Sequence, residues 1–216
     1  MNTRNKTRKL TLLGVLIAVQ IVLTMINIGL IPLPIIKGTI LHIPVIVGAV
    51  LLGPAEGIIL GAAFGILSVI TNTIQPGLTS FVFSPFVTVG NTNGNFLSLI
   101  VAIVPRVLIG ITAYYSYKLV RKVDQTKIFS YATAGIVGAL TNTIFVMGSI
   151  YIFFGQQYAA AQQMAFSELF KAIMLVIAGN GIPEAIAAAI IVPAICKPLS
   201  LIFKFNNNRR DRKSVV

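Results

Sequence analysis

The chain has 216 residues, of which 56% are hydrophobic and only 10% are charged, and its mean hydropathy is +0.90. Soluble domains carry about 25% charged residues, so this composition excludes an ordinary soluble domain and indicates an integral membrane protein. The net charge of +12 does not indicate nucleic-acid binding, because the lysines and arginines stand between apolar segments and not on one polar face.

Six apolar segments follow one another along the chain. A helix needs about 20 apolar residues to cross a hydrocarbon layer about 30 Å thick. We predict helices over residues 10–29, 40–52, 55–74, 96–119, 129–154 and 172–203. The second segment is short for a full span and is expected to form a hairpin with the third, turned at Gly53-Pro54. The sequence therefore predicts an all-α membrane protein, a six-transmembrane-helix bundle.

We expect three parts: a basic stretch over residues 1–9, one membrane domain over 10–203 and a basic tail over 204–216. The first segment is expected to stay as a helix, because no small-residue cleavage site of a signal peptide follows it.

The positive charges predict the orientation. Fourteen of the seventeen lysines and arginines lie before the first segment, in the link after the fourth, or near the end of the chain. With six helices these three regions fall on one side, so both termini are expected to be cytoplasmic. Lys37, Arg106 and Lys171 are then the exceptions, on or near the outer side.

The stretch from residue 57 to residue 105 has no charged residue, but its middle is rich in amides, hydroxyls and phenylalanines. Neutral hydrogen-bonding groups beside aromatic rings suit a lid over a small polar molecule. Asn72, Phe83 and Asn93 are the candidate substrate-binding residues in this stretch. The alternative is a loop that lies on the headgroup region with its phenylalanines in lipid.

Arg106 stands after Pro105, a short way inside the fourth segment. An arginine at the bilayer centre costs about 2.5–3.5 kcal/mol on insertion scales, so an arginine at this position indicates a specific role. Its planar guanidinium suits a carboxylate or phosphate of a substrate. The alternatives are extension to the outer headgroups and pairing with an internal acid.

Glu184 is the corresponding buried acid, in the middle of the sixth segment. Pro183 is expected to kink or break the helix beside it, freeing backbone carbonyls. Glu184 suits a substrate hydroxyl or amide, or neutralisation of Arg106. Asn142 and Asn180 also lie in apolar surroundings, where an amide either binds substrate or joins helices.

Small residues recur at a spacing of four in two segments. Gly14 and Ala18 lie in the first; Gly53, Gly57, Gly61 and Gly65 lie at and within the third. Such stripes let another helix approach closely. We expect the third segment to use its stripe inside the bundle, whereas that of the first serves either internal packing or a different subunit.

Catalytic signatures are absent from the sequence. There is no phosphate-binding loop of the Gly-x-x-x-x-Gly-Lys-Ser/Thr type. The single histidine, His42, and the single cysteine, Cys196, are too few ligands for a zinc site. A solute-binding transporter subunit is therefore favoured over a membrane enzyme, and an independent facilitator is the other alternative.

Several motifs together resemble a substrate-binding (S) component of the energy-coupling factor transporters, the prokaryotic vitamin importers. They are found at residues 14–18, 42–48, 52–61, 81–86, 105–110 and 182–185, and the resemblance covers about residues 10–194.

The resemblance implies a six-helix bundle in a prokaryotic cell membrane that binds one vitamin from outside. It implies as partners a membrane coupling (T) subunit, on which Gly14 and Ala18 dock, and two cytoplasmic ATPases. ATP and magnesium then belong to those partners, with no cofactor in this chain. Within the family the pattern is nearest to the branch for pantothenate, pyridoxine, hydroxymethylpyrimidine and folate. Pantothenate matches one cation plus many neutral hydrogen-bonding groups.

Overall fold

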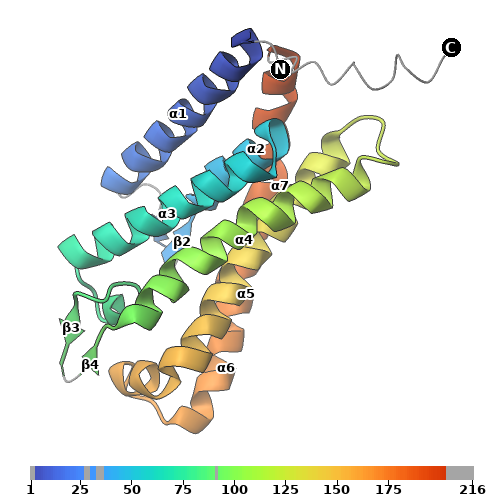
Figure 1. The fold of residues 1–216 in the computed structure, drawn as a ribbon. Coiled ribbons are helices and arrows are strands. Elements are labelled where there is room, and N and C mark those ends of the chain that lie inside the picture. The colour runs from blue at the N-terminus through green and yellow to red at the C-terminus, as the bar shows by residue number, and fades with distance from the viewer. Residues whose placement is uncertain (1–2, 27–29, 33–36, 91, 203–216) are drawn as a thin grey trace, which may run out of the picture.

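The computed structural model describes residues 3–26, 30–32, 37–90 and 92–202, and its described part is an almost entirely helical bundle (Figure 1). The helices are α1 (Thr3–Met25), α2 (His42–Leu52), α3 (Pro54–Ile74), α4 (Phe96–Val120), α5 (Ile128–Ala161), α6 (Phe166–Val176) and α7 (Ile182–Ile202). A π-helical turn, Ile177–Gly181, joins α6 to α7, and a 3-10 turn, Ser80–Val82, follows α3. The predicted helical fold is confirmed.

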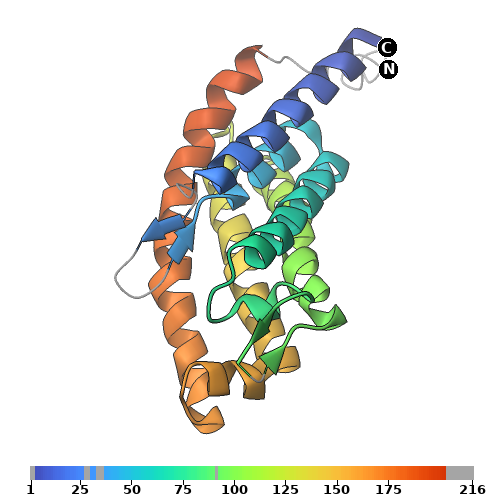
Figure 2. The ribbon, with the colours of Figure 1, turned by 90° about the vertical axis from the view of Figure 1, so that its left-hand side faces the viewer.

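Two short antiparallel hairpins project from the helices (Figure 2). In the first, β1 (Leu30–Pro32) pairs with β2 (Lys37–Thr39), between α1 and α2. In the second, β3 (Thr88–Val89) pairs with β4 (Thr92–Asn93), between α3 and α4. Neither hairpin was predicted.

Five helical stretches of the described chain are long and apolar enough to cross a membrane. They are Lys6–Met25, Pro54–Ile74, Phe96–Val120, Ile128–Ala161 and Phe166–Leu201. The last two are longer than predicted, because the alanines and glutamines after residue 154 continue the helix and α6 begins at Phe166. Alanine and glutamine are good helix formers, so polarity there did not mean a loop.

The short helix α2 forms the centre of the bundle. Its 11 residues rise about 16 Å, too little to cross about 30 Å of hydrocarbon alone. Ten of the 11 are buried, and α2 contacts α1, α3, α4, α5 and α7. Gly53 has φ 131°, a left-handed conformation that favours glycine, and Pro54 begins α3. The predicted hairpin turn at Gly53-Pro54 is confirmed.

The glycine stripe of α3 packs directly on α4. A Cβ on Gly57 would lie 3.0 Å from Gly110 Cα, and one on Gly61 would lie 2.2 Å from the carbonyl oxygen of Arg106. A Cβ on Gly65 would lie 2.8 Å from the carbonyl oxygen of Ala102. Residue numbers rise along α3 as they fall along α4, so the two helices run antiparallel with their backbones in contact. The expected internal use of this stripe is confirmed.

The link between α4 and α5 is closed by one acid. The carboxylate of Asp124 accepts hydrogen bonds from the backbone N–H and hydroxyl of Thr126, at 2.9 and 2.8 Å, and from those of Ser130, both at 2.8 Å. Burial raises the pKa of Asp124, but these hydrogen bonds more than offset it and hold the pKa well below the ordinary value. Asp124 therefore stays charged and caps the start of α5.

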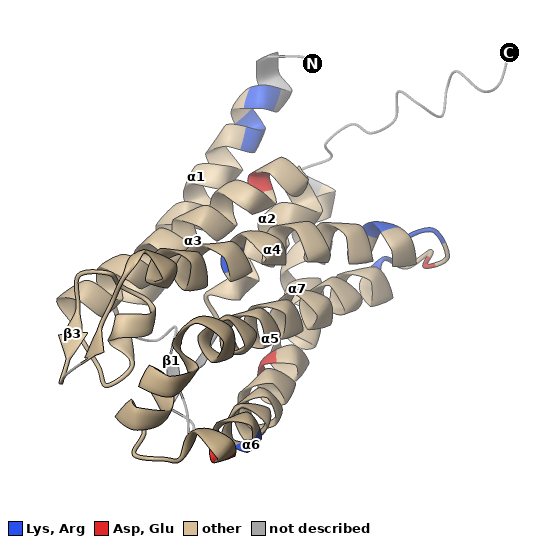
Figure 3. Cartoon of the chain, turned by 60° about the horizontal axis from the view of Figure 1, so that its bottom comes forward, with Lys and Arg blue, Asp and Glu red and all other residues tan. Residues whose placement is uncertain are grey.

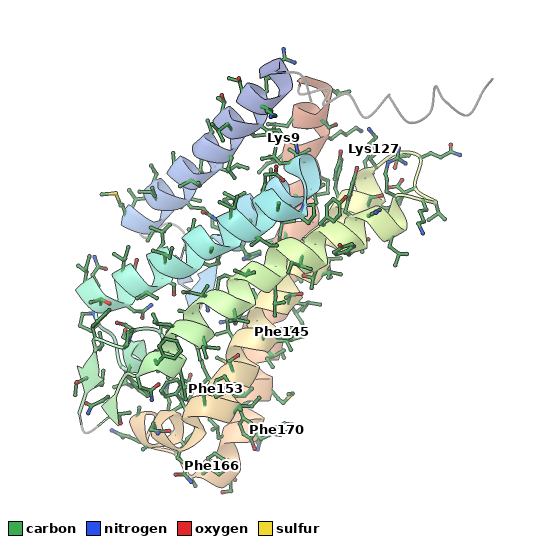
Figure 4. The ribbon with its side chains drawn as sticks, in the orientation of Figure 1. Lys9, Lys127, Phe145, Phe153, Phe166 and Phe170 are labelled. Carbon is green, nitrogen blue, oxygen red and sulfur yellow. The ribbon has the colours of Figure 1, made fainter. Side chains whose placement is uncertain are left out.

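The two ends of the bundle differ in charge. Lysines and arginines gather at the start of α1 and at the α4–α5 link (Figure 3). Lys9 and Lys127 lie towards that end, whereas Phe166 and Phe170 lie at the opposite end (Figure 4). In the first region Lys9 Nζ contacts Glu56 Oε1 at 3.3 Å and donates to the carbonyl of Leu52 at 2.7 Å. The predicted tail, residues 204–216, lies outside the described residues.

Candidate substrate site

Arg106 lies inside the bundle on α4, with only 7% of its surface exposed. Its guanidinium carbon is 5.4 Å from the ring centre of Phe64 on α3 and 5.3 Å from that of Phe83, which follows the 3-10 turn. Both distances are within the range of cation–π attraction, so two aromatic rings stabilise the cation where water is scarce. Extension of Arg106 to the headgroups is therefore not what the structure shows.

One backbone acceptor holds the arginine. Arg106 Nη1 donates to the carbonyl oxygen of Val101 at 2.8 Å. The Nε of Arg106 is buried and has no hydrogen-bond partner within the described chain. Glu184 on α7 also acts on Arg106 through its opposite charge. The guanidinium is thus oriented, and one of its donors is still available.

The loop that carries Phe83 is fixed to α3 and α4 by hydroxyl groups. Ser80 Oγ donates to Asn72 Oδ1 at 2.7 Å, and Ser84 Oγ pairs with Thr73 Oγ1 at 2.7 Å. Ser98 Oγ, at the start of α4, donates to the carbonyl of Phe81 at 2.7 Å. These bonds keep the loop folded over the end of the bundle where Phe83 meets Arg106.

Asn72 is one of the loop anchors. Its Nδ2 donates to the carbonyl of Ser68 at 2.8 Å, and its Oδ1 accepts from Ser80, so both ends of the amide are in hydrogen bonds. Asn93 is exposed at the β3–β4 hairpin. Substrate binding by either residue stays a prediction.

The phenylalanines of this loop point in different directions. Phe81 is fully buried and meets Phe154 edge to face, with ring centres 6.0 Å apart. Phe83 is half-buried over Arg106, whereas Phe86 is 79% exposed. Of the loop rings, that of Phe83 therefore lies over Arg106 and that of Phe86 faces outward, whereas a role of the loop as a lid over substrate stays a prediction.

A second polar group lies between α5 and α7. Asn142, Thr143, Asn180 and Glu184 are all buried. Thr143 Oγ1 donates to Glu184 Oε2 at 3.2 Å, and a Cβ on Gly181 would lie 3.4 Å from Thr143, which places these parts of the two helices side by side. Asn142 Oδ1 is buried and accepts no hydrogen bond from the described residues. The described chain thus has a buried, unpartnered acceptor on α5 as well as the buried cation on α4.

The π-helical turn Ile177–Gly181 contains Asn180 and ends two residues before Pro183. Proline lacks an N–H, and a π-helical turn is a common way for a helix to absorb such an interruption. The predicted break beside Glu184 thus takes the form of this turn within a continuous helical rod.

Two residues at the site were not predicted. Phe64 was hidden in an apolar helix, and only the antiparallel register of α3 on α4 shows that a residue near Gly61 must approach Arg106. Thr143 was visible next to Asn142, but its role depends on Glu184, which is 41 residues away in sequence.

Comparison with known proteins identifies the family. Residues 8–196 match the model of the family described as "ECF transporter, substrate-specific component". The chain belongs to this family. It is also similar to the pantothenic acid transporter PanT of Lactococcus lactis subsp. cremoris (strain MG1363), with 35% identity over 209 residues, which cover 95% of this chain and 98% of that protein. Membership makes the chain a membrane transporter subunit and not an enzyme, as the sequence predicted.

In this S component the small residues of α1 lie on its outward face. Gly14 and Ala18 are exposed, and within the described chain a Cβ on Gly14 would meet nothing within 4 Å. Among the α1 residues whose burial is described, 6–25, the buried ones are Leu12, Leu16 and Gln20. Gly14 is two residues from Leu12 and from Leu16, which is about 200° around a helix. The stripe therefore faces away from the described part of the bundle, and internal packing of α1 through Gly14 and Ala18 is not what that part shows.

Proposed function

We propose that this chain is the high-affinity pantothenate-binding S component of an ATP-driven vitamin importer. Pantothenate carries one carboxylate, hydroxyls and one amide. The buried Arg106, with its Nε still available, suits the carboxylate, and the acceptor of Asn142 suits a hydroxyl. The similarity to a protein named for pantothenic acid transport supports the same substrate.

The observation that carries this proposal is the position of Arg106. A cation held between two rings and a carbonyl is desolvated before the ligand arrives, so an entering carboxylate gains a strong charge-assisted hydrogen bond at little cost in ordering. Asn72, Phe83, Asn93, Asn180 and Glu184 are proposed to complete the site around the remaining groups of the vitamin.

Binding to the purified protein tests the substrate. We expect pantothenate to bind and to raise the melting temperature, and Arg106→Gln to weaken binding by at least about 30-fold, since removing one partner of a buried charged pair costs roughly 2–5 kcal/mol. Lys171→Gln is the control, because Lys171 is an exposed cation on α6.

Two results would contradict the proposal. Normal pantothenate binding by Arg106→Gln would remove Arg106 from the site. Protection by pyridoxine, hydroxymethylpyrimidine or folate, without protection by pantothenate, would move the chain to another branch of the family.

We also propose that both termini face the cytoplasm of a prokaryotic cell. The cations at the start of α1 and in the α4–α5 link lie towards one end of the bundle, as retention of positive charge on the cytoplasmic side requires. Labelling of single cysteines at residues 6 and 122, in cells in which Cys196 is replaced by Ala, tests this. Labelling of either residue by a membrane-impermeant reagent in intact cells would show that it faces outward and would contradict the proposed orientation.

Transport is proposed to require partners. Gly14 and Ala18 form a docking stripe for the membrane coupling subunit, and two cytoplasmic ATPases bind ATP and magnesium, with no cofactor in this chain. We expect Gly14→Leu with Ala18→Leu to keep pantothenate binding and to lose ATP-linked uptake in proteoliposomes. Normal uptake by this variant would refute the docking role, and uptake by the chain alone would indicate an independent facilitator.

A further inference from the structure

The residue before the arginine explains how the arginine is held. In an α-helix the N–H of residue 105 would donate to the carbonyl of residue 101, four positions earlier. Pro105 has no N–H, so the carbonyl of Val101 lacks its helical donor. That carbonyl is the one that accepts from Arg106 Nη1 at 2.8 Å. The proline thus creates the acceptor that the next side chain uses.

The surroundings make this bond matter. Val101 is fully buried, so its carbonyl has no access to water, and a buried carbonyl without a donor is costly. Helical side chains also lean towards the N-terminus of their helix, which directs Arg106 back along α4 towards Val101 and Phe83. A carbonyl can accept two hydrogen bonds, but only an unsatisfied one favours the arginine strongly.

We infer that Pro105 is a positioning residue for the carboxylate of the substrate: by leaving the Val101 carbonyl unsatisfied, it holds the Arg106 guanidinium between Phe64 and Phe83. This inference rests on the proposed binding of a carboxylate by Arg106. It implies that the interior proline of α4 costs helix stability and contributes to affinity instead.

Stability measurements without ligand test the bond itself. Pro105→Ala restores the N–H that satisfies Val101, so its melting temperature should equal or exceed that of the wild type. Arg106→Gln should lower the melting temperature clearly in the protein with Pro105 and less in the Pro105→Ala background, where Val101 keeps a donor. Equal losses in the two backgrounds would overturn the coupling, whatever the substrate is.

Binding measurements test the use of the bond. Pro105→Ala should weaken pantothenate binding by about 10-fold, of the order expected for one hydrogen bond. Binding of pantothenol, in which the carboxylate is replaced by a neutral hydroxymethyl group, should be unchanged by Pro105→Ala. Pro105→Ala with Arg106→Gln should bind pantothenate no more weakly than Arg106→Gln alone.

The outcomes separate the two proposals. If the wild type does not bind pantothenate, the proposed function fails. If Arg106→Gln binds pantothenate normally, the proposed role of Arg106 fails, and the positioning role fails with it. If Arg106→Gln loses binding but Pro105→Ala binds pantothenate normally or more tightly, the positioning role fails alone. Equal weakening of pantothenate and pantothenol by Pro105→Ala would also overturn it, because a general distortion of α4 would then be the cause. Pro193→Ala, at an interior proline of α7, is the matched control and should leave both affinities unchanged.

Discussion

Replacing Gly61 by alanine should separate α3 from α4. The added Cβ would lie 2.2 Å from the carbonyl oxygen of Arg106, 2.7 Å from its carbonyl carbon and 2.9 Å from the Cα of Val107. All three are backbone atoms, so no side-chain rotation relieves the overlap. The helices must move apart by about 1 Å to reach ordinary contact distances, and the close packing along the stripe is lost.

The expected cost is that of overpacking a tight interface, about 1–3 kcal/mol. For a chain of this size the melting temperature changes by about 2–4 °C for each kcal/mol, so a fall of roughly 2–12 °C is expected. Gly14→Ala is the matched control, because a Cβ there meets none of the described atoms within 4 Å. Alanine is also the better helix former, so its melting temperature should be unchanged or higher.

The chain supplies its own reporter for this assay. Cys196 is the single cysteine and is fully buried, so a thiol-reactive fluorogenic dye labels it only as the bundle opens. Apparent melting temperatures of the two variants and the wild type are compared at one heating rate, because membrane proteins often unfold irreversibly. A Gly61→Ala protein that melts with or above the wild type would show that the backbone contact contributes nothing.

Two further predictions concern the basic end of the bundle. Asp124→Asn should lower the melting temperature at pH 7. Because the pKa of Asp124 is lower in the folded state, its charge stabilises the fold above the unfolded-state pKa of about 3.9. This stabilisation is lost as the pH falls through the folded-state pKa. A melting series from pH 8 to pH 3 checks this, and a gap between the two proteins that widens on acidification would contradict it. Lys9→Met should destabilise more than Glu56→Gln, since Lys9 loses both the partly exposed ion pair, worth about 0–1 kcal/mol, and the bond to Leu52. The same dye assay compares them, and a larger loss in Glu56→Gln would refute the order.

Much of the fold could be predicted because a few residues have strong local effects. Pro54 can begin a helix but not continue one, and Gly53 alone tolerates φ 131°, so the sequence predicts the α2–α3 turn. The end of α5 could not be found in this way. Its last turns contain alanine and glutamine, which suit a helix and also tolerate exposure to water. No glycine or proline marks the boundary at Ala161.

The binding site was predicted less completely than the fold. Arg106 was identified because a cation in the hydrocarbon layer is energetically costly and therefore indicates a function. Its partners could not be identified, because they depend on the register of α3 on α4. Asn72 was chosen because it lies in an uncharged stretch rich in amides, hydroxyls and phenylalanines, which suits a lid over a small polar molecule. An amide that anchors a loop and one that binds a ligand look the same in sequence, and the structure gives Asn72 two partners, Ser68 and Ser80.

The two glycine stripes show what decides between such alternatives. In α3 the small residues are themselves the contact face, whereas in α1 the contact face is Leu12, Leu16 and Gln20. Gln20 is fully buried and donates to the carbonyl of Leu60 at 3.3 Å. A polar side chain in a spanning helix turns towards the protein, so Gln20 already indicated in the sequence which side of α1 faces inward. Gly14 lies six residues from Gln20, about 600° and hence 120° away from it around the helix, so its stripe must face out.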